Sequence, residues 1–125
     1  MKPSDFSRPA LRVLAVSATA LAVSATAYAH ARPTSYEPAP NAEVTSPNQL
    51  TIHFSEPLEP AFSKITLSDA SGKAAVANNA QVDTADTKAM HLTLQPLAAG
   101  RYTVKWSAVA TDGHRTHGTY AFDVK

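Results

Sequence analysis

Short runs of alternating apolar and polar residues, separated by turn residues, constrain the fold of this chain more than any other feature. Leu50, Ile52 and Phe54 share one side of such a run, and Ile65 and Leu67 share one side of the next. Because successive side chains of a β-strand point to opposite faces, each run predicts a strand with one buried face. No long apolar period of 3.6 residues is found, so the sequence predicts an all-β fold.

The same alternation continues through the second half of the chain. Three more strands are predicted there, with these apolar faces: Met90, Leu92 and Leu94; Tyr102, Val104 and Trp106; Tyr120, Phe122 and Val124. About seven short strands in a chain of this size are typical of a sandwich of two sheets. Tyr102 follows a turn that contains Gly100, as in a tyrosine corner, although an ordinary core tyrosine would fit the same position.

The first 29 residues have the features of a secretory leader. Basic residues precede an apolar stretch over residues 13–23, and Ala27-Tyr28-Ala29 fits the A-x-A cleavage signal. The stretch is too short and too rich in alanine for a membrane span, which needs about 20 strongly apolar residues. We therefore expect residues 1–29 to be a signal peptide and residues 30–125 to be the exported domain. Cleavage after Ala31 is the alternative, because an A-x-A triplet ends there too.

Composition limits what the exported part can be. Its 96 residues suffice for one domain of about 100 residues. Loss of Lys2, Arg8, Arg12 and Asp5 with the leader leaves 8 basic and 9 acidic residues, so no excess of positive charge points to nucleic acid. The chain has no cysteine, so the fold depends on its apolar core and a metal ion would have to be held without thiolates.

Cleavage before His30 would create an N-terminal histidine, whose free α-amine and imidazole together can chelate a metal ion. Asp112-Gly113-His114 offers a carboxylate and a second imidazole on a tight turn, at the end of the strand that begins at Arg101. Three nitrogens and one oxygen form a donor set that copper(II) prefers in tetragonal geometry. The residues alone also allow a simpler interpretation, in which Asp-Gly is a hairpin turn and His114 is a solvated loop histidine.

From His30 onward the chain resembles the periplasmic copper-resistance protein C (CopC) family. The resemblance rests on four segments in the same order: His30-Ala31, the run F-S-E-P-L-E-P-A-F-S from Phe54 to Ser63, the run G-R-Y-T-V-K-W from Gly100 to Trp106, and Asp112-Gly113-His114 followed by Gly118. It implies a periplasmic protein with an all-β, seven-stranded Greek-key sandwich or barrel of the immunoglobulin-like or cupredoxin-like kind.

The resemblance also implies a function. Family members bind one copper(II) ion per chain, and the roles of ligand carry over to His30, Asp112 and His114. Glu56 resembles an occasional additional oxygen ligand or a group behind the ligands. The resemblance implies a role in copper resistance or homeostasis without enzymatic activity, and it suggests an inner-membrane CopD-type transporter as partner. We expect the protein itself to be a monomer.

The remaining methionine and histidines are assigned from their positions. Some family members carry a methionine-rich stretch that binds copper(I), but Met90 is the only methionine beyond the leader and its alternation places it in the core. A copper(I) site is therefore not expected. We expect His53 and His91 to be exposed structural histidines, although His53 could support the metal site. His117 could be an alternate ligand or could orient His114.

Two other functions are compatible with the sequence. An N-terminal histidine chelate on a β-sandwich also resembles the copper centre of lytic polysaccharide monooxygenases, which would make the protein a copper-dependent oxidase of the histidine-brace type. Such an enzyme needs an open coordination position and a broad surface for its polymer. Asp112 would occupy that position, and the single tryptophan, Trp106, is predicted to lie in the core. A metal-free adhesion or carbohydrate-binding sandwich is the third candidate.

Overall fold

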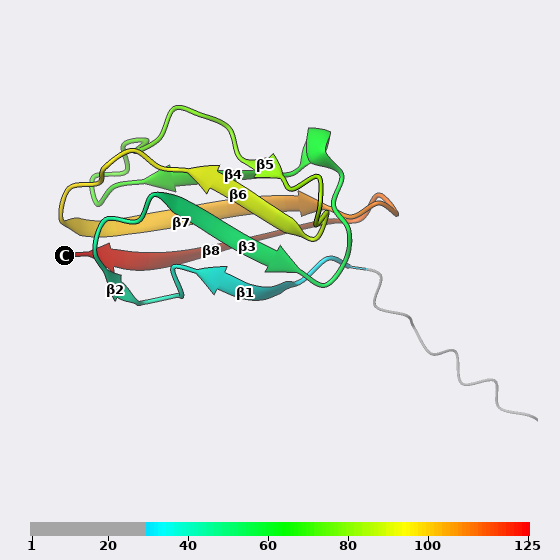
Figure 1. Ribbon diagram of the computed structural model, residues 1–125, viewed down its shortest axis with the longest axis horizontal. Coiled ribbons are helices and arrows are strands. Elements are labelled where there is room, and N and C mark those ends of the chain that lie inside the picture. The colour runs from blue at the N-terminus through cyan, green and yellow to red at the C-terminus, as the bar shows by residue number, and fades with distance from the viewer. Residues whose placement is uncertain (1–29) are drawn as a thin grey trace, which may run out of the picture.

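The computed structural model describes residues 30–125, which form two packed β-sheets (Figure 1). The expected signal peptide, residues 1–29, lies outside the described residues, and so does the A-x-A signal that ends at Ala29. Within residues 30–125 there is no helix long and apolar enough to cross a membrane.

The first sheet contains four antiparallel strands. β1 (Pro33–Glu37) pairs with β3 (Gln49–Phe54), and β3 pairs with β6 (Ala89–Thr93). β5 (Gln81–Val82) adds a short edge beyond β6. The outer face of this sheet carries His53 on β3 and His91 on β6.

The second sheet also contains four strands, ordered β2-β8-β7-β4. β2 (Glu43–Val44) pairs in parallel with β8 (Arg115–Val124), and β8 pairs antiparallel with β7 (Gly100–Val109). β4 (Lys64–Ser68) forms the other edge, and the 3₁₀ turn Pro60–Phe62 leads into it. β7 and β8 are consecutive in the chain, so a single hairpin turn connects the two longest strands.

The predicted two-sheet, all-β class is confirmed, but the described residues contain eight strands rather than about seven. β2 and β5 have two residues each, too few for an alternating pattern to be recognised. The last strand begins at Arg115, five residues before Tyr120, the first residue of the apolar face predicted for it. Its pairing with β7 continues without a break until Arg115 stands opposite Val109.

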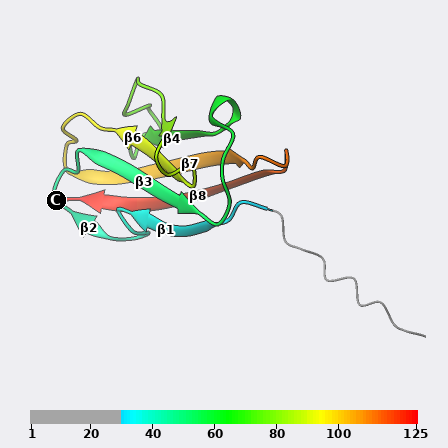
Figure 2. The same cartoon turned by 45° about the vertical axis from the view of Figure 1, so that its right-hand side comes forward.

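The core lies between the sheets and consists of the predicted apolar faces. Leu50, Ile52, Met90 and Phe122 are fully buried. Figure 2 shows β3 and β6 of the first sheet crossing over β7 and β8 of the second. The buried residues of both sheets form one hydrophobic cluster. The burial of Met90 confirms its assignment to the core.

Trp106 connects the two sheets beneath the β7–β8 hairpin. Its side chain is 7% exposed, and its ring meets that of Phe54 on β3 nearly edge-on, with 5.3 Å between the ring centroids. Gly118 lies directly opposite Trp106, and a Cβ atom at Gly118 would stand 2.6 Å from Cζ2 of the indole. The indole ring therefore occupies the space that a side chain at Gly118 would need.

Tyr102 forms the tyrosine corner that the sequence allowed. Its hydroxyl donates a hydrogen bond of 2.7 Å to the carbonyl of Ala98, four residues upstream. Its ring is buried and stacks on Phe122 of β8, with the centroids 6.0 Å apart. The hydroxyl is thus satisfied inside the core while the ring contributes apolar contact.

We expect Trp106→Ala to lower the free energy of unfolding by about 3–5 kcal/mol, because a large buried aromatic is lost and a cavity remains. Gly118→Ala should also destabilise the parent protein, but it should cost less in the Trp106→Ala background, where the cavity can accept the methyl group. Chemical denaturation of the four proteins measures both effects. Equal costs of Gly118→Ala in the two backgrounds would mean that the indole does not restrict position 118.

Candidate metal centre

The β7–β8 turn carries Asp112 and His114 at one end of the sandwich. Two backbone hydrogen bonds close this turn: Ala110 accepts at its carbonyl from Gly113, at 2.8 Å, and donates from its N–H to the carbonyl of His114, at 3.0 Å. Gly113 has a φ of 90°, which side chains rarely permit, so glycine allows the turn to close. Figure 1 shows the turn projecting from the same end at which the described chain begins, at His30.

Within the turn, Asp112 and His114 are held together by two hydrogen bonds. Oδ1 of Asp112 accepts from the backbone N–H of His114 at 3.0 Å, and Oδ2 lies 2.9 Å from Nδ1 of the same residue. The first of these bonds is the main cause that lowers the pKa of Asp112, followed by the bond to the imidazole. Asp112 is therefore a carboxylate at neutral pH, and Nδ1 of His114 carries the proton because a carboxylate can only accept.

His30 completes the group that the sequence predicted. Its ring lies edge-on to that of His114, with an angle of 76° and 4.8 Å between the centroids. The charge of His30 is one of the smaller causes that lower the pKa of Asp112. The fold thus brings His30, from the other end of the described chain, to the turn that carries Asp112 and His114.

The three side chains are close together, but their donor atoms do not yet converge. Among residues 30–125, no three or more His, Cys, Asp or Glu side chains stand in an arrangement that could hold a metal ion. Both oxygens of Asp112 are turned to His114, and the backbone nitrogen of His30 is in a peptide bond in the full chain. Nε2 of His114 takes no part in these bonds, whereas coordination by Asp112 would compete with them. The donor types, two imidazoles and a carboxylate, are nevertheless those that copper(II) accepts.

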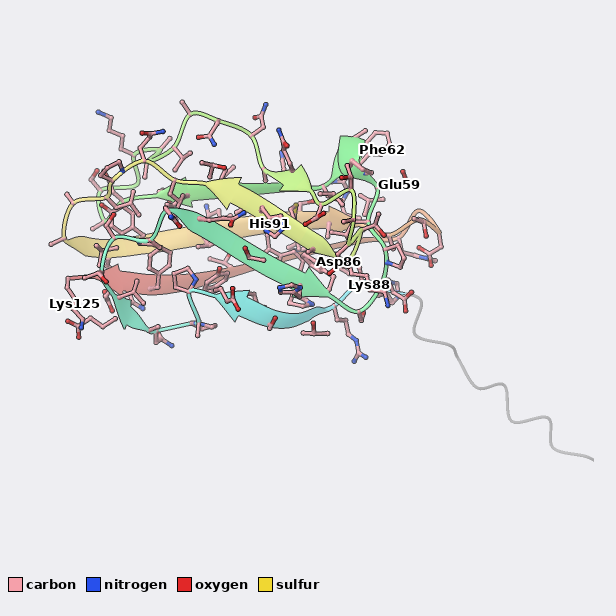
Figure 3. The ribbon with its side chains drawn as sticks, viewed as in Figure 1. Glu59, Phe62, Asp86, Lys88, His91 and Lys125 are labelled. Atoms are coloured by element: carbon pink, nitrogen blue, oxygen red, sulfur yellow. The ribbon has the colours of Figure 1, made fainter. Side chains whose placement is uncertain are left out.

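Glu56 lies between two residues, one of which contacts the chain at His30 and the other the chain at the β7–β8 turn. Ser55 precedes it and hydrogen-bonds the backbone at His30, and Pro57 follows it and accepts at its carbonyl from the N–H of Thr111 at 3.2 Å. Figure 3 shows Phe62 on the nearby 3₁₀ turn at this same end of the sandwich. Glu56 is therefore placed at the correct end, and its role as an additional ligand stays a prediction.

His91 does not belong to the centre and is half-buried rather than exposed. Its Nε2 lies 3.1 Å from Oδ2 of Asp83, and its Nδ1 lies 2.9 Å from Oγ1 of Thr51. Backbone N–H donation from Ala85 is the main cause of a lowered pKa at Asp83, and the bond to His91 is the next. Figure 3 places His91 on β6, set back along the sheet from the hairpin turn. These contacts are those of a structural histidine, and the bond to His91 satisfies the hydroxyl of the buried Thr51.

His53 and His117 have other neighbours than the three predicted ligands. Nδ1 of His53 is 4.0 Å from Oδ2 of Asp86, in the loop before β6, so the imidazole forms a loose ion pair with that carboxylate when protonated. His117 is exposed on β8 opposite Ser107. Supporting roles for these two histidines at the metal centre stay predictions.

Two contacts of the centre could not be recognised in the sequence. The side chains of Ser55 and Thr116 hydrogen-bond the backbone of His30, Ala31 and Arg32. Hydroxyl groups that bind a distant backbone follow no spacing rule, so no sequence pattern indicated them.

The sequence of this chain is similar to those of known proteins. The sequence model of the CopC domain family matches residues 33–125 of this chain. The chain is 38% identical over 98 residues to Protein YobA of Escherichia coli strain K12, a match that covers 77% of this chain and 79% of that protein. It is 37% identical over 107 residues to copper resistance protein C of Pseudomonas syringae pv. tomato, covering 77% of this chain and 81% of the relative.

A solved structure agrees with these matches. The crystal structure of CopC from Methylosinus trichosporium OB3b superposes with a TM-score of 0.73 at 31% identity, covering 77% of this chain and 94% of that chain. Sequence and fold therefore lead to the same assignment, and the resemblance seen in the sequence is confirmed. The chain belongs to the CopC family.

Proposed function

We propose that this protein binds one copper(II) ion in the periplasm and serves copper resistance or homeostasis, with His30, Asp112 and His114 as ligands. The observation that carries this proposal is the contact between the imidazoles of His30 and His114, at 4.8 Å between centroids, beside the carboxylate of Asp112. Membership of the CopC family and the similarity to copper resistance protein C support copper as the bound ion.

The donor set favours copper(II) over other divalent ions. After cleavage before His30, the free α-amine would join the two imidazoles and the carboxylate of Asp112, giving three nitrogens and one oxygen. Copper(II) binds most tightly among the first-row divalent ions to nitrogen and oxygen donors, and it accepts a tetragonal arrangement of them. The chain has no cysteine, and Met90 is fully buried, so thiolate and thioether ligands do not contribute.

Binding and transfer fit this protein better than catalysis. Trp106, the only tryptophan, is buried in the core and offers no platform for a polysaccharide. A carboxylate ligand from Asp112 would fill a coordination position that an oxidase keeps open. We therefore infer a monomeric, non-enzymatic copper carrier that is exported with the leader residues 1–29 and passes its ion to an inner-membrane CopD-type partner.

The mature protein should bind one copper(II) ion per chain, much more tightly than zinc(II) or nickel(II), because its donors match the preference of copper(II). Competition titrations with the three metals measure the order of affinity. Electron paramagnetic resonance of the copper form should show a tetragonal spectrum with nitrogen coupling. A blue-copper spectrum, or equal affinity for zinc(II), would contradict the assigned donor set.

His114→Ala and Asp112→Ala should each weaken copper(II) binding without unfolding the domain, because both side chains lie on an exposed turn. Loss of a group behind a metal ligand costs roughly 10–100-fold in affinity, and loss of a ligand should cost at least as much. Thr119→Ala is the control, since it shortens an exposed side chain on β8, the strand that begins directly after His114. An affinity unchanged in both test variants, or lost in the control alone, would move the site elsewhere.

Blocking the amine of His30 should lower copper(II) affinity by orders of magnitude while every side chain stays in place, because one of two chelating nitrogens is removed. The comparison is a copper(II) competition titration of the protein that begins at His30 and of a form extended by one methionine. Mass spectrometry confirms both N-termini. Equal affinities would exclude the amine as a ligand, and a natural N-terminus at Arg32 would exclude His30 altogether.

A further inference from the structure

Two hydroxyl side chains, those of Ser55 and Thr116, hold the first described residues of the chain. Oγ of Ser55 accepts a hydrogen bond from the N–H of Arg32 at 3.0 Å and donates to the carbonyl of His30 at 3.4 Å. The backbone N–H of Ser55 donates to the carbonyl of Arg32 at 2.8 Å. Oγ1 of Thr116 donates to the carbonyl of Ala31 at 2.7 Å. Each of the three residues is thus bonded through its backbone.

These hydroxyls come from opposite layers of the sandwich. Ser55 follows β3 of the first sheet, and Thr116 is on β8 of the second, two residues beyond His114. Ala31 lies between them and is 0% exposed, so this residue anchors the segment in the core, while His30 and Arg32 on either side of it are exposed. One hydrogen bond, between Ala31 and Thr116, therefore connects the chain at His30 to the strand that begins directly after His114.

The segment needs such bonds because it lies before the first strand. The ladder between β1 and β3 begins where Pro33 pairs with Phe54, so residues 30–32 precede it. Chain ends are usually poorly ordered unless something ties them down. An unordered ligand would have to be fixed when the ion binds, and the lost conformational freedom would reduce the affinity.

We propose that Ser55 and Thr116 are positioning residues that fix the imidazole and nitrogen of His30 beside His114 before copper arrives. This inference rests on the proposed function, because it concerns the same copper site. It assigns to the two hydroxyls a share of the copper affinity although neither touches the ion. Ala31 contributes by its small size, since a larger side chain would not fit in its buried position.

The test compares the exported protein, processed to begin at His30, with four variants. Thr116→Val keeps the shape and β-branching of threonine but removes the donor, and Ser55→Ala removes the other hydroxyl. Thr116→Ser keeps a hydroxyl donor at position 116, so it should behave like the parent protein and not like Thr116→Val. Thr119→Val is the matched control, because Thr119 is an exposed threonine on the same strand.

The first measurement is made without metal. Order parameters from nuclear magnetic resonance should show the backbone N–H of Arg32 near the rigid value of about 0.85 in the parent protein, in Thr116→Ser and in Thr119→Val. In Thr116→Val and Ser55→Ala the order parameter should fall toward about 0.6 or lower. Amides within β7 and β8 should be unchanged, which separates a loosened segment from an unfolded domain.

The second measurement is copper(II) affinity by competition titration. Thr116→Val and Ser55→Ala should each lose roughly two- to tenfold, the change that corresponds to one net hydrogen bond. Thr116→Ser and Thr119→Val should bind like the parent. If Arg32 loosens while affinity is unchanged, or if neither quantity changes, the positioning role is wrong although the copper site stands. A parent protein that binds no copper would overturn the proposed function and this inference together.

Discussion

The uninterrupted pairing of β7 with β8 determines where the turn at the end of the sandwich points. The two strands are joined over ten residue pairs with no shift in register, ending where Val109 faces Arg115. A slip of one residue would move every side chain of a strand to the opposite face. The register is fixed by the core, because Trp106 must face Gly118 to fit between the sheets. The packing of a buried indole therefore also sets the position of His114, which directly precedes Arg115.

The buried faces of most strands could be predicted because a period of two is a property of the extended backbone itself. β1 is not visible in the sequence pattern, since Pro33 begins it and Pro38 follows it and both interrupt any alternation. Tyr120 lies on its predicted face, opposite Val104 of β7 and against the core, but it is only half-buried. Its ring packs on that of Tyr36 of β1, with 4.5 Å between the ring centroids. Its buried hydroxyl has no hydrogen-bond partner among the described residues. Burial, followed by the charge of Tyr36, raises the pKa of Tyr120 well above its usual value.

The candidate site was predictable to the extent that its parts are local. Asp112, Gly113 and His114 form one turn, so their proximity follows from the sequence alone. The approach of His30 depends on long-range packing, and it was inferred from the chemistry of an N-terminal histidine and from the family resemblance. The half-buried position of His91 could not be foreseen, because its partner Asp83 lies in an irregular loop whose course no period indicates.

The centre shows how hydrogen bonds can hold predicted ligands beside one another. The carboxylate of Asp112 accepts from both the backbone N–H and the ring of His114, and these two bonds hold the exposed turn together. Coordination of copper by Asp112, as proposed, would compete with these bonds, whereas the ring centroids of His30 and His114 already lie 4.8 Å apart. The short distance between the two rings would favour copper binding, and the hydrogen bonds of Asp112 would oppose it. A site of this kind gains affinity because the chain that carries one ligand is already ordered. Part of its donor set stays hydrogen-bonded until an ion with a strong preference for nitrogen and carboxylate oxygen breaks those bonds.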